Sequence, residues 1–180
     1  MIVAREKRKK NVAEYVLYMW QVEDTIRAFN FNINTLEERL LSQFKQPPHV
    51  MDEIRDWYTN LILAMHEEGI TQSGHLQIVK SLIDEMYQLH HRLMETMIDP
   101  GYIHTYKLAK ENINSFRTKL GKSESNEIEL CFFALYGLLL LRLKKKEVTE
   151  ETLKAMNTFS TLLSHLSASF KKMEEGKIEI

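Results

Sequence analysis

Apolar residues recur at three- and four-residue intervals along almost the whole chain, and polar residues fill the positions between them. This spacing places the apolar side chains on one face of a helix. No stretch alternates apolar and polar residues for long enough to predict a strand. The pattern therefore predicts an all-α protein. We expect six or seven helices, at about residues 4–29, 34–46, 48–68, 74–98, 102–120, 126–146 and 149–175.

Two of these segments are apolar on more than one side. Every position of Val12–Val22 is apolar except Glu14 and Gln21, and the run Leu130–Leu141 has no charged residue. An apolar arc this wide needs neighbours on several sides. We therefore expect these two helices at the centre of a bundle, with the narrower stripes of the other helices packed around them.

Turn residues separate the predicted helices. Pro47 and Pro48, Gly69, Pro100 and Gly121 each follow or interrupt an apolar stripe, as expected where a helix ends or a new one begins. The length of 180 residues is that of one domain. We expect residues 1–176 to form a single helical domain and residues 177–180 to form a flexible tail.

Charge and composition narrow the classes of partner. The chain has 24 basic and 25 acidic residues, a balance that gives no long-range attraction to nucleic acid or to an acidic membrane. The basic cluster Arg5–Lys10 is best explained as a solvated face, and the cluster Arg142–Lys146 as a favourable interaction with the negative end of a helix. The longest apolar run, of twelve residues, is too short to cross a bilayer.

Cysteine usage bears on the compartment. Cys131 is the only cysteine, so an intrachain disulfide is impossible and a reducing compartment is the simpler interpretation. The basic N-terminal residues are not followed by the apolar stretch of a secretory signal. We therefore expect a cytoplasmic protein.

Known signatures of catalysis and metal binding are missing from the sequence. It contains no glycine-rich phosphate loop, no paired-cysteine site, no nucleophile elbow and neither His-Glu-x-x-His nor Glu-x-x-His, which are the patterns of zinc proteases and di-iron bundles. We assign no catalytic residue, no cofactor and no metal ligand. The sequence favours a protein that is not an enzyme.

Polar residues within the first predicted helix are the leading candidates for a ligand site. Glu23 and Arg27 lie one turn apart, and Tyr15 and Trp20 could form the walls of a pocket around them. The simpler interpretation is an ordinary ion pair at i,i+4 spacing, and it is the one we favour.

His90 is the second candidate, because it falls within the apolar face of its helix. A core histidine bonded to a polar partner is a commoner arrangement than a ligand-binding histidine. Gly137 interrupts the apolar run of the sixth helix, and we expect it to allow the close approach of another helix.

The N-terminal thirty residues resemble a known family. A basic start is followed by Asn11-Val12-Ala13-Glu14-Tyr15 and then by Met19-Trp20-Gln21-Val22-Glu23-Asp24. This pattern is similar to that of a bacterial family of about this length, catalogued as a domain of unknown function. The resemblance implies a small all-helical cytoplasmic protein of bacteria. It implies no activity, cofactor or catalytic residue.

Two functions are favoured by the sequence, and binding of a phosphate backbone through Arg5–Lys10 remains a third, less favoured one. The first is a non-catalytic interaction or structural module, with a protein partner or as a homodimer. Its contact surface would come from the fifth and seventh helices or from the basic N-terminus. The alternative is a helical bundle, or a small enzyme, that binds a small ligand beside Tyr15, Trp20, Glu23 and Arg27 or near His90.

Overall fold

The computed structural model describes residues 2–121 and 124–178, and every regular element in this part of the chain is helical. The predicted all-α class is confirmed. The described residues form eight α-helices and one 3₁₀ helix: α1 (Ile2–Lys10), α2 (Val12–Ala28), α3 (Ile33–Arg39), η1 (Leu41–Gln43), α4 (Pro48–Glu67), α5 (Gln77–Thr96), α6 (Pro100–Leu120), α7 (Glu127–Leu143) and α8 (Glu150–Glu174).

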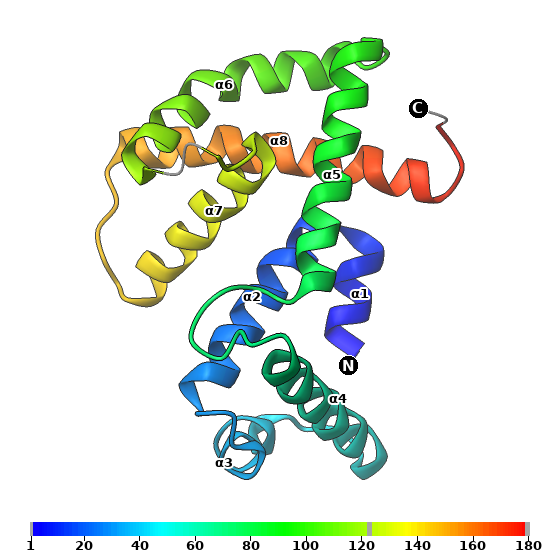
Figure 1. Ribbon diagram of the computed structural model, residues 1–180, viewed down its shortest axis with the longest axis vertical. Coiled ribbons are helices and arrows are strands. Elements are labelled where there is room, and N and C mark those ends of the chain that lie inside the picture. Colours follow the sequence, from blue (N-terminus) through cyan, green and yellow to red (C-terminus); the bar gives the residue numbers. More distant parts are fainter. Residues whose placement is uncertain (1, 122–123, 179–180) are drawn as a thin grey trace.

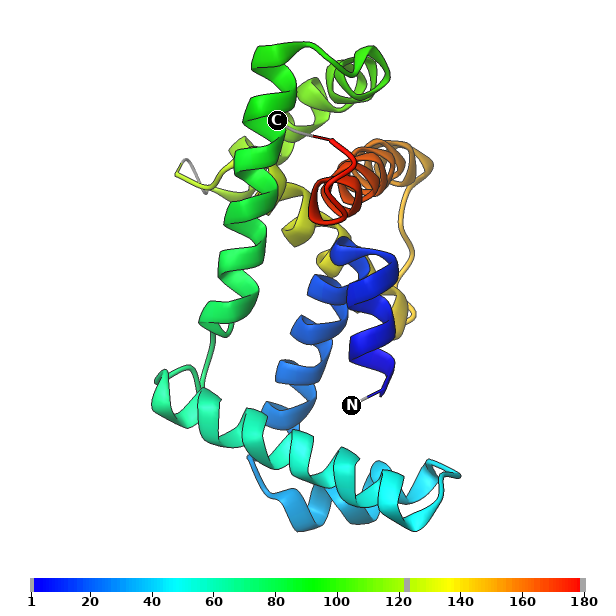
Figure 2. The same cartoon turned by 90° about the vertical axis from the view of Figure 1, so that its right-hand side faces the viewer.

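The predicted first helix is wrong, because the chain breaks at Asn11 and forms two helices. Asn11 is extended, with φ of −156° and ψ of 109°, and its side chain accepts a hydrogen bond of 3.1 Å from the backbone N–H of Glu14. This N-cap satisfies one of the donors left free at the start of α2. The chain turns back there, so that α1 lies along α2 (Figure 2), and Lys7 pairs with Glu14 at 3.2 Å.

The centre of the bundle is not limited to the two expected helices, because α5 contacts α2, α6, α7 and α8, and α8 is equally well surrounded. α2 contacts α1, α5, α7 and α8, whereas α7 contacts α2, α5, α6 and α8. α8 contacts α2, α5, α6 and α7. The apolar stripes of α6 and α8, which could have faced a partner, pack against each other instead (Figure 1). The buried residues of the α8 stripe are Phe159, Leu162, Leu163, Leu166 and Phe170.

The apolar run of α7 is enclosed only in its first half. Ile128, Leu130 and Cys131 have no exposed surface, but Leu141 is 40% exposed and Leu143 is 60% exposed. Burial raises the pKa of the Cys131 thiol well above its ordinary value, so this cysteine lacks the thiolate character that makes a cysteine reactive. The second half of α7 therefore presents apolar side chains near the surface, beside the ends of α6 and α8.

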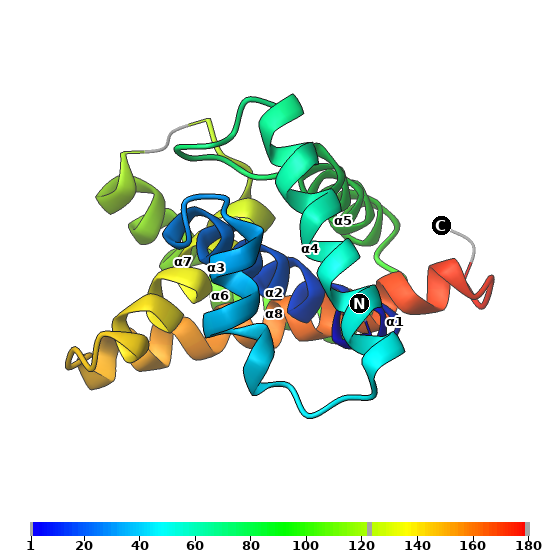
Figure 3. The ribbon, with the colours of Figure 1, turned by 90° about the horizontal axis from the view of Figure 1, so that it is seen from below.

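The segment α3–η1–α4 forms the lower end of the molecule (Figures 1 and 3). Pro48 occupies the first turn of α4, as expected, and this helix runs across the lower ends of α2 and α5 (Figure 2). Its buried residues, Ile54, Tyr58, Ile62 and Met65, belong to the same apolar cluster as α2 and α8.

The C-terminal end of α8 returns to the N-terminus, where Arg8 forms two hydrogen bonds with Glu174, of 2.6 and 3.0 Å. Of the predicted flexible tail, residues 179 and 180 lie outside the described residues. Within the described part, none of the helices combines the length and the apolar character needed to span a membrane.

Candidate functional site

Glu23, the first candidate on α2, connects this helix to the loop before α5. Its side chain has no exposed surface, and one carboxylate oxygen lies 2.6 Å from Nδ1 of His75. The other oxygen accepts the backbone N–H of Leu76 at 3.1 Å. The His75 ring stacks on Trp20 with 4.0 Å between ring centroids. Glu23 and Trp20 therefore fix the beginning of α5.

Arg27 holds the same loop at a second point. Its guanidinium pairs with Asp24 at 2.8 Å and donates hydrogen bonds to the carbonyl oxygens of Ile70 and Gly74. Glu23 and Arg27 thus have different partners and do not form the i,i+4 ion pair that their spacing suggests. The backbone carbonyls of an irregular segment are satisfied in this way.

Tyr15 lies about two turns before Glu23 on α2. It is half-buried against the core, and burial raises the pKa of its hydroxyl. Tyr15, Trp20, Glu23 and Arg27 line neither of the two cavities described next. The structure brings Trp20, Glu23 and Arg27 together around residues 70–76 and leaves Tyr15 apart from them.

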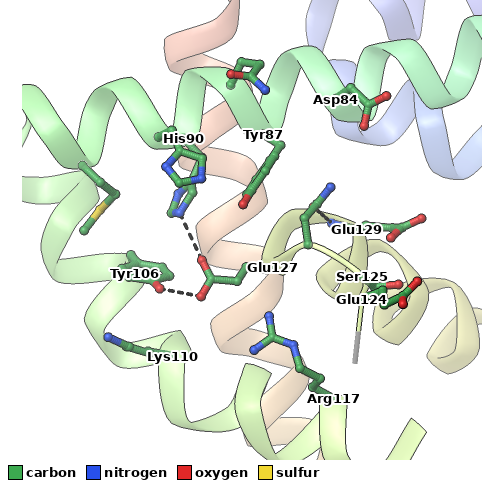
Figure 4. Close-up of a pocket in the computed structure, with 14 residues that line it drawn as sticks. Asp84, Tyr87, His90, Tyr106, Lys110, Arg117, Glu124, Ser125, Glu127 and Glu129 are labelled. Atoms are coloured by element: carbon green, nitrogen blue, oxygen red, sulfur yellow. Dashed lines mark hydrogen bonds and ion pairs between the residues drawn. The ribbon is translucent and has the colours of Figure 1, made fainter. Parts of the chain in front are cut away.

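A polar cavity of about 970 Å³ lies between α5, α6 and the first turn of α7 (Figure 4). His90 is 3% exposed at its edge, with Nδ1 2.6 Å from the hydroxyl of Tyr102 and Nε2 3.3 Å from the carboxylate of Glu127. Tyr106 donates a hydrogen bond of 2.8 Å to the other carboxylate oxygen of Glu127. His90 therefore lies in a network that joins three helices.

One assignment of the protons gives every polar group of this network a partner. If Nε2–H of His90 donates to Glu127, then Nδ1 accepts the hydroxyl proton of Tyr102, and each group has a partner. The hydrogen bond from His90 is the largest cause that lowers the pKa of Glu127 below its ordinary value, and the hydrogen bond from Tyr106 adds to it. Burial raises the pKa of Tyr102 and of Tyr106. Glu127 is thus an ionised acceptor for the neutral phenol of Tyr106 and for the ring N–H of His90.

This cavity also has charged walls. Lys110 and Arg117 reach it from α6, and Asp84 reaches it from α5 (Figure 4). Among the described residues of the chain, no group of three or more His, Cys, Asp or Glu side chains could hold a metal ion. Because its central polar groups bind one another, the network first of all holds α5, α6 and α7 together.

An apolar pocket of about 660 Å³ lies on the other side of α6, between the end of this helix, the second half of α7 and the beginning of α8. Gly137 of α7 lines it. A Cβ atom built on Gly137 would meet nothing within 4 Å. The expectation that Gly137 allows the close approach of another helix is wrong. The glycine instead leaves open space in the pocket.

The walls of this pocket are mostly apolar, and several of them keep exposed surface. Leu120 is 41% exposed and Leu141 is 40% exposed, and both line the pocket. Polar groups also line it, among them Lys119, Lys144 and Glu151. The remaining apolar lining residues are Phe116, Phe133, Ala134, Leu138, Leu140, Ala155, Met156 and Phe159. A concave apolar surface with a few polar groups is the usual form of a small-molecule site.

Sequence reasoning singled out His90 and Gly137 but missed the other residues that define the two cavities. Glu127 was recognisable as an acidic residue after the N-cap Asn126, but its pairing with His90 spans two helices. Lys119 and Lys144 follow apolar stripes and have the ordinary position of basic residues at helix ends. Gly137 was the one available signal for the apolar pocket, since a glycine within a long apolar helix needs a reason.

Comparison with known proteins places the chain in a family. A family model described as "Domain of unknown function (DUF4924)" matches residues 1–177, which confirms the resemblance to a family of unknown function. No curated protein and no solved structure matches the chain. The function therefore has to be argued from the geometry of the two cavities.

Proposed function

The chain belongs to the family described as a domain of unknown function (DUF4924), and we propose its function from the geometry of its own pockets. The protein is a non-catalytic binding module that holds an apolar small molecule between α6, α7 and α8. The observation that carries this proposal is the open space at Gly137. The proposal keeps the ligand-binding alternative of the sequence analysis but places the pocket between α6, α7 and α8 instead of around the candidate residues of α2.

Gly137 supports the proposal because packing gives no other reason for it. A glycine inside a helix lowers stability by about 1 kcal/mol relative to alanine. Here a Cβ atom would meet no neighbour, so the fold itself would accept a side chain at this position. A side chain would, however, reduce the volume of the pocket. Glycine at this position therefore keeps the volume of the pocket and lowers the stability of the helix.

The size and lining of the pocket agree with a small apolar ligand. Its volume of about 660 Å³ lies within the range of about 300–1,000 Å³ that is common for ligand pockets. Phe116, Phe133 and Met156 are only partly buried, so a ligand would remove more of their surface from water. Each ligand methylene buried there would contribute about 0.8 kcal/mol.

The chemistry of the walls favours binding over catalysis. Among the described residues that line the pocket, the titratable side chains are Lys119, Lys144 and Glu151. None of these groups forms a hydrogen-bonded nucleophile and base pair of the kind that covalent catalysis needs. The polar cavity is the weaker candidate for a ligand site, because His90, Glu127 and Tyr106 already bind one another.

Fluorescence titration with an environment-sensitive apolar dye tests the proposal. Wild type should bind the dye with enhanced fluorescence. Gly137→Leu places a side chain in the open space and should weaken binding about tenfold or more. Gly137→Ala, a smaller change at the same position, should retain binding. If circular dichroism shows that wild type and Gly137→Leu are both folded, equal affinity of the two proteins for the dye would contradict the proposal.

A protein partner is a second candidate, favoured by the leucines around the same pocket. Leu120, Leu141, Leu143 and Leu153 are each at least 38% exposed, and such an apolar surface can also be covered by another chain. A second copy of this protein is the simplest such partner. Sedimentation velocity over a wide concentration range tests it, and a dimer that Leu141→Lys dissociates would support it.

We further propose that residues 1–176 form one domain that works in the bacterial cytoplasm. The apolar cluster that extends from Val12 to Phe170 supports a single core, and the family resemblance supports a bacterial origin. The single cysteine, Cys131, is a buried free thiol, which suits a reducing compartment. Limited proteolysis that releases two stable fragments would contradict the single domain.

A further inference from the structure

We infer that the ligand of the apolar pocket is an aliphatic monocarboxylate, whose carboxylate is held at the mouth by Lys119 and Lys144. The inference rests on the proposed function, because it requires that the pocket holds a small molecule. It adds the chemical class of that molecule and the residues that select it.

The two lysines reach the pocket from different helices. Lys119 lies in the last turn of α6, and Lys144 is the residue that follows α7 and caps it. Both line the pocket and both are exposed. Their ammonium groups form no ion pair with any carboxylate of the described residues. Two cations from separate helices therefore line one pocket, and neither is held in an ion pair within the described part of the chain.

The charge balance of the lining leaves a place for one anion. Glu151 is the one acidic residue among the described residues that line the pocket, against two lysines. It lies in the first turn of α8, where the positive end of the helix stabilises a carboxylate. The lining thus has a net charge of +1, and a single carboxylate on the ligand would neutralise it.

The interior of the pocket indicates the chemistry of the part of the ligand that lies away from the carboxylate. Phe116, Phe133, Leu138 and Met156 line it with apolar surface, and Gly137 adds open space between them. Burying an ionised group among such side chains would be costly, whereas an ionised group at the solvated mouth keeps its hydration and gains the lysines. The occupant that fits both parts has an apolar chain and one terminal anion.

Displacement of the bound dye by chain-matched probes tests the inference. Decanoate should bind wild type about tenfold more tightly than 1-decanol, which has the same chain without the charge. From octanoate to decanoate, each added methylene should tighten binding about fourfold. Raising the salt concentration should weaken the binding of decanoate but not that of 1-decanol, because salt screens exposed charges.

Lysine variants then identify the groups that hold the anion. Lys119→Gln and Lys144→Gln should each weaken the binding of decanoate by up to about fivefold. Neither variant should change the affinity for 1-decanol. Lys107→Gln and Lys146→Gln are matched controls, because these exposed lysines belong to the same regions but do not line the pocket. Both controls should bind decanoate as wild type does.

The outcomes separate this inference from the proposed function. If decanoate and 1-decanol bind equally and the lysine variants have no effect, the anionic ligand is wrong while the apolar pocket stands. If neither probe nor dye binds, the proposed function is wrong as well. A dimer that excludes the dye and persists in decanoate would show that a second copy covers the pocket, and it would overturn both.

Discussion

The carboxylate of Glu23 in α2 is fully buried, and it lies 2.6 Å from Nδ1 of His75 in the loop before α5. The two residues are 52 positions apart in the chain. Since Glu23 also accepts the backbone N–H of Leu76, one acidic side chain fixes the place where α5 begins. A residue whose sequence context suggested a ligand site therefore connects two segments of the fold.

Replacing Glu23 should destabilise the protein strongly. In Glu23→Ala, His75 and the N–H of Leu76 lose their buried acceptor, and we expect the free energy of unfolding to fall by about 3–5 kcal/mol. Urea denaturation followed by circular dichroism measures this change. Gln21→Ala on the exposed side of the same helix should change stability by less than about 0.5 kcal/mol. Similar small effects for both variants would mean that the buried contact is unimportant.

Replacing Gly137 should stabilise the protein. In Gly137→Ala the added methyl group meets no neighbour, and we expect a gain of about 0.8–1 kcal/mol from helix propensity. Thermal unfolding measures it. Gly121→Ala is the contrasting control, because Gly121 has φ of +68° at the end of α6, where alanine is strained and should destabilise. A loss of stability in Gly137→Ala would show that the space is filled.

Replacing Asn11 should test why α1 and α2 are separate helices. Asn11→Ala removes the side chain that accepts the N–H of Glu14, and we expect a loss of about 0.5–2 kcal/mol. Asn11→Asp keeps an acceptor and should remain close to wild type. Urea denaturation of the three proteins measures the difference. If Asn11→Ala were more stable and more helical than wild type, the continuous helix expected from the sequence pattern would be the preferred form.

Glu127 should make stability depend on pH in the acid range. Its pKa in the folded state lies below the ordinary value of 4.5, chiefly because of the hydrogen bond from His90. The unfolded state therefore binds more protons, so this contribution is fully present above about pH 4.5 and is lost as the pH falls through the lowered pKa. Glu127→Gln should be less stable at neutral pH and should lose less stability on acidification.

Glu129→Gln is the matched control for this pH profile. It removes a carboxylate from the same first turn of α7. It therefore changes the net charge and the interaction with the positive end of the helix as Glu127→Gln does. Urea denaturation from neutral pH into the acid range compares the variants with wild type. Asp99 also has a lowered pKa, caused first by the backbone N–H of Tyr102, so part of the acid dependence should remain in Glu127→Gln. Identical profiles for the two glutamine variants would contradict the role of the His90 contact.

Local signals in the sequence predicted some features of the fold and missed others. Asn126, Thr149 and Pro48 each begin a helix as expected, because capping and proline geometry act within a few residues. The break at Asn11 was missed because the charged residues before it contain no glycine or proline that would end a helix. The Asn11 side chain competes for the N–H of Glu14, and this local competition outweighed the periodicity.

The candidate sites could not be obtained from the sequence in the same way. His90 was recognised as a polar residue on an apolar face, but its partner Glu127 lies on another helix. Arg27 was one turn from Glu23, yet the carbonyl groups of the loop at Ile70 and Gly74 bind it. The spacing of residues along one helix gives the directions of their side chains, but not the groups that other segments bring to them.

The sequence by itself determined that this chain is helical, where most of its helices begin and end, and which faces are apolar. Those properties depend on interactions between residues a few positions apart. Only the tertiary structure decided which polar residues pair across helices, that α5 and α8 join α2 and α7 at the centre, and that a pocket opens at Gly137. These features depend on how far whole helices approach one another, a distance set by the packing of all side chains together.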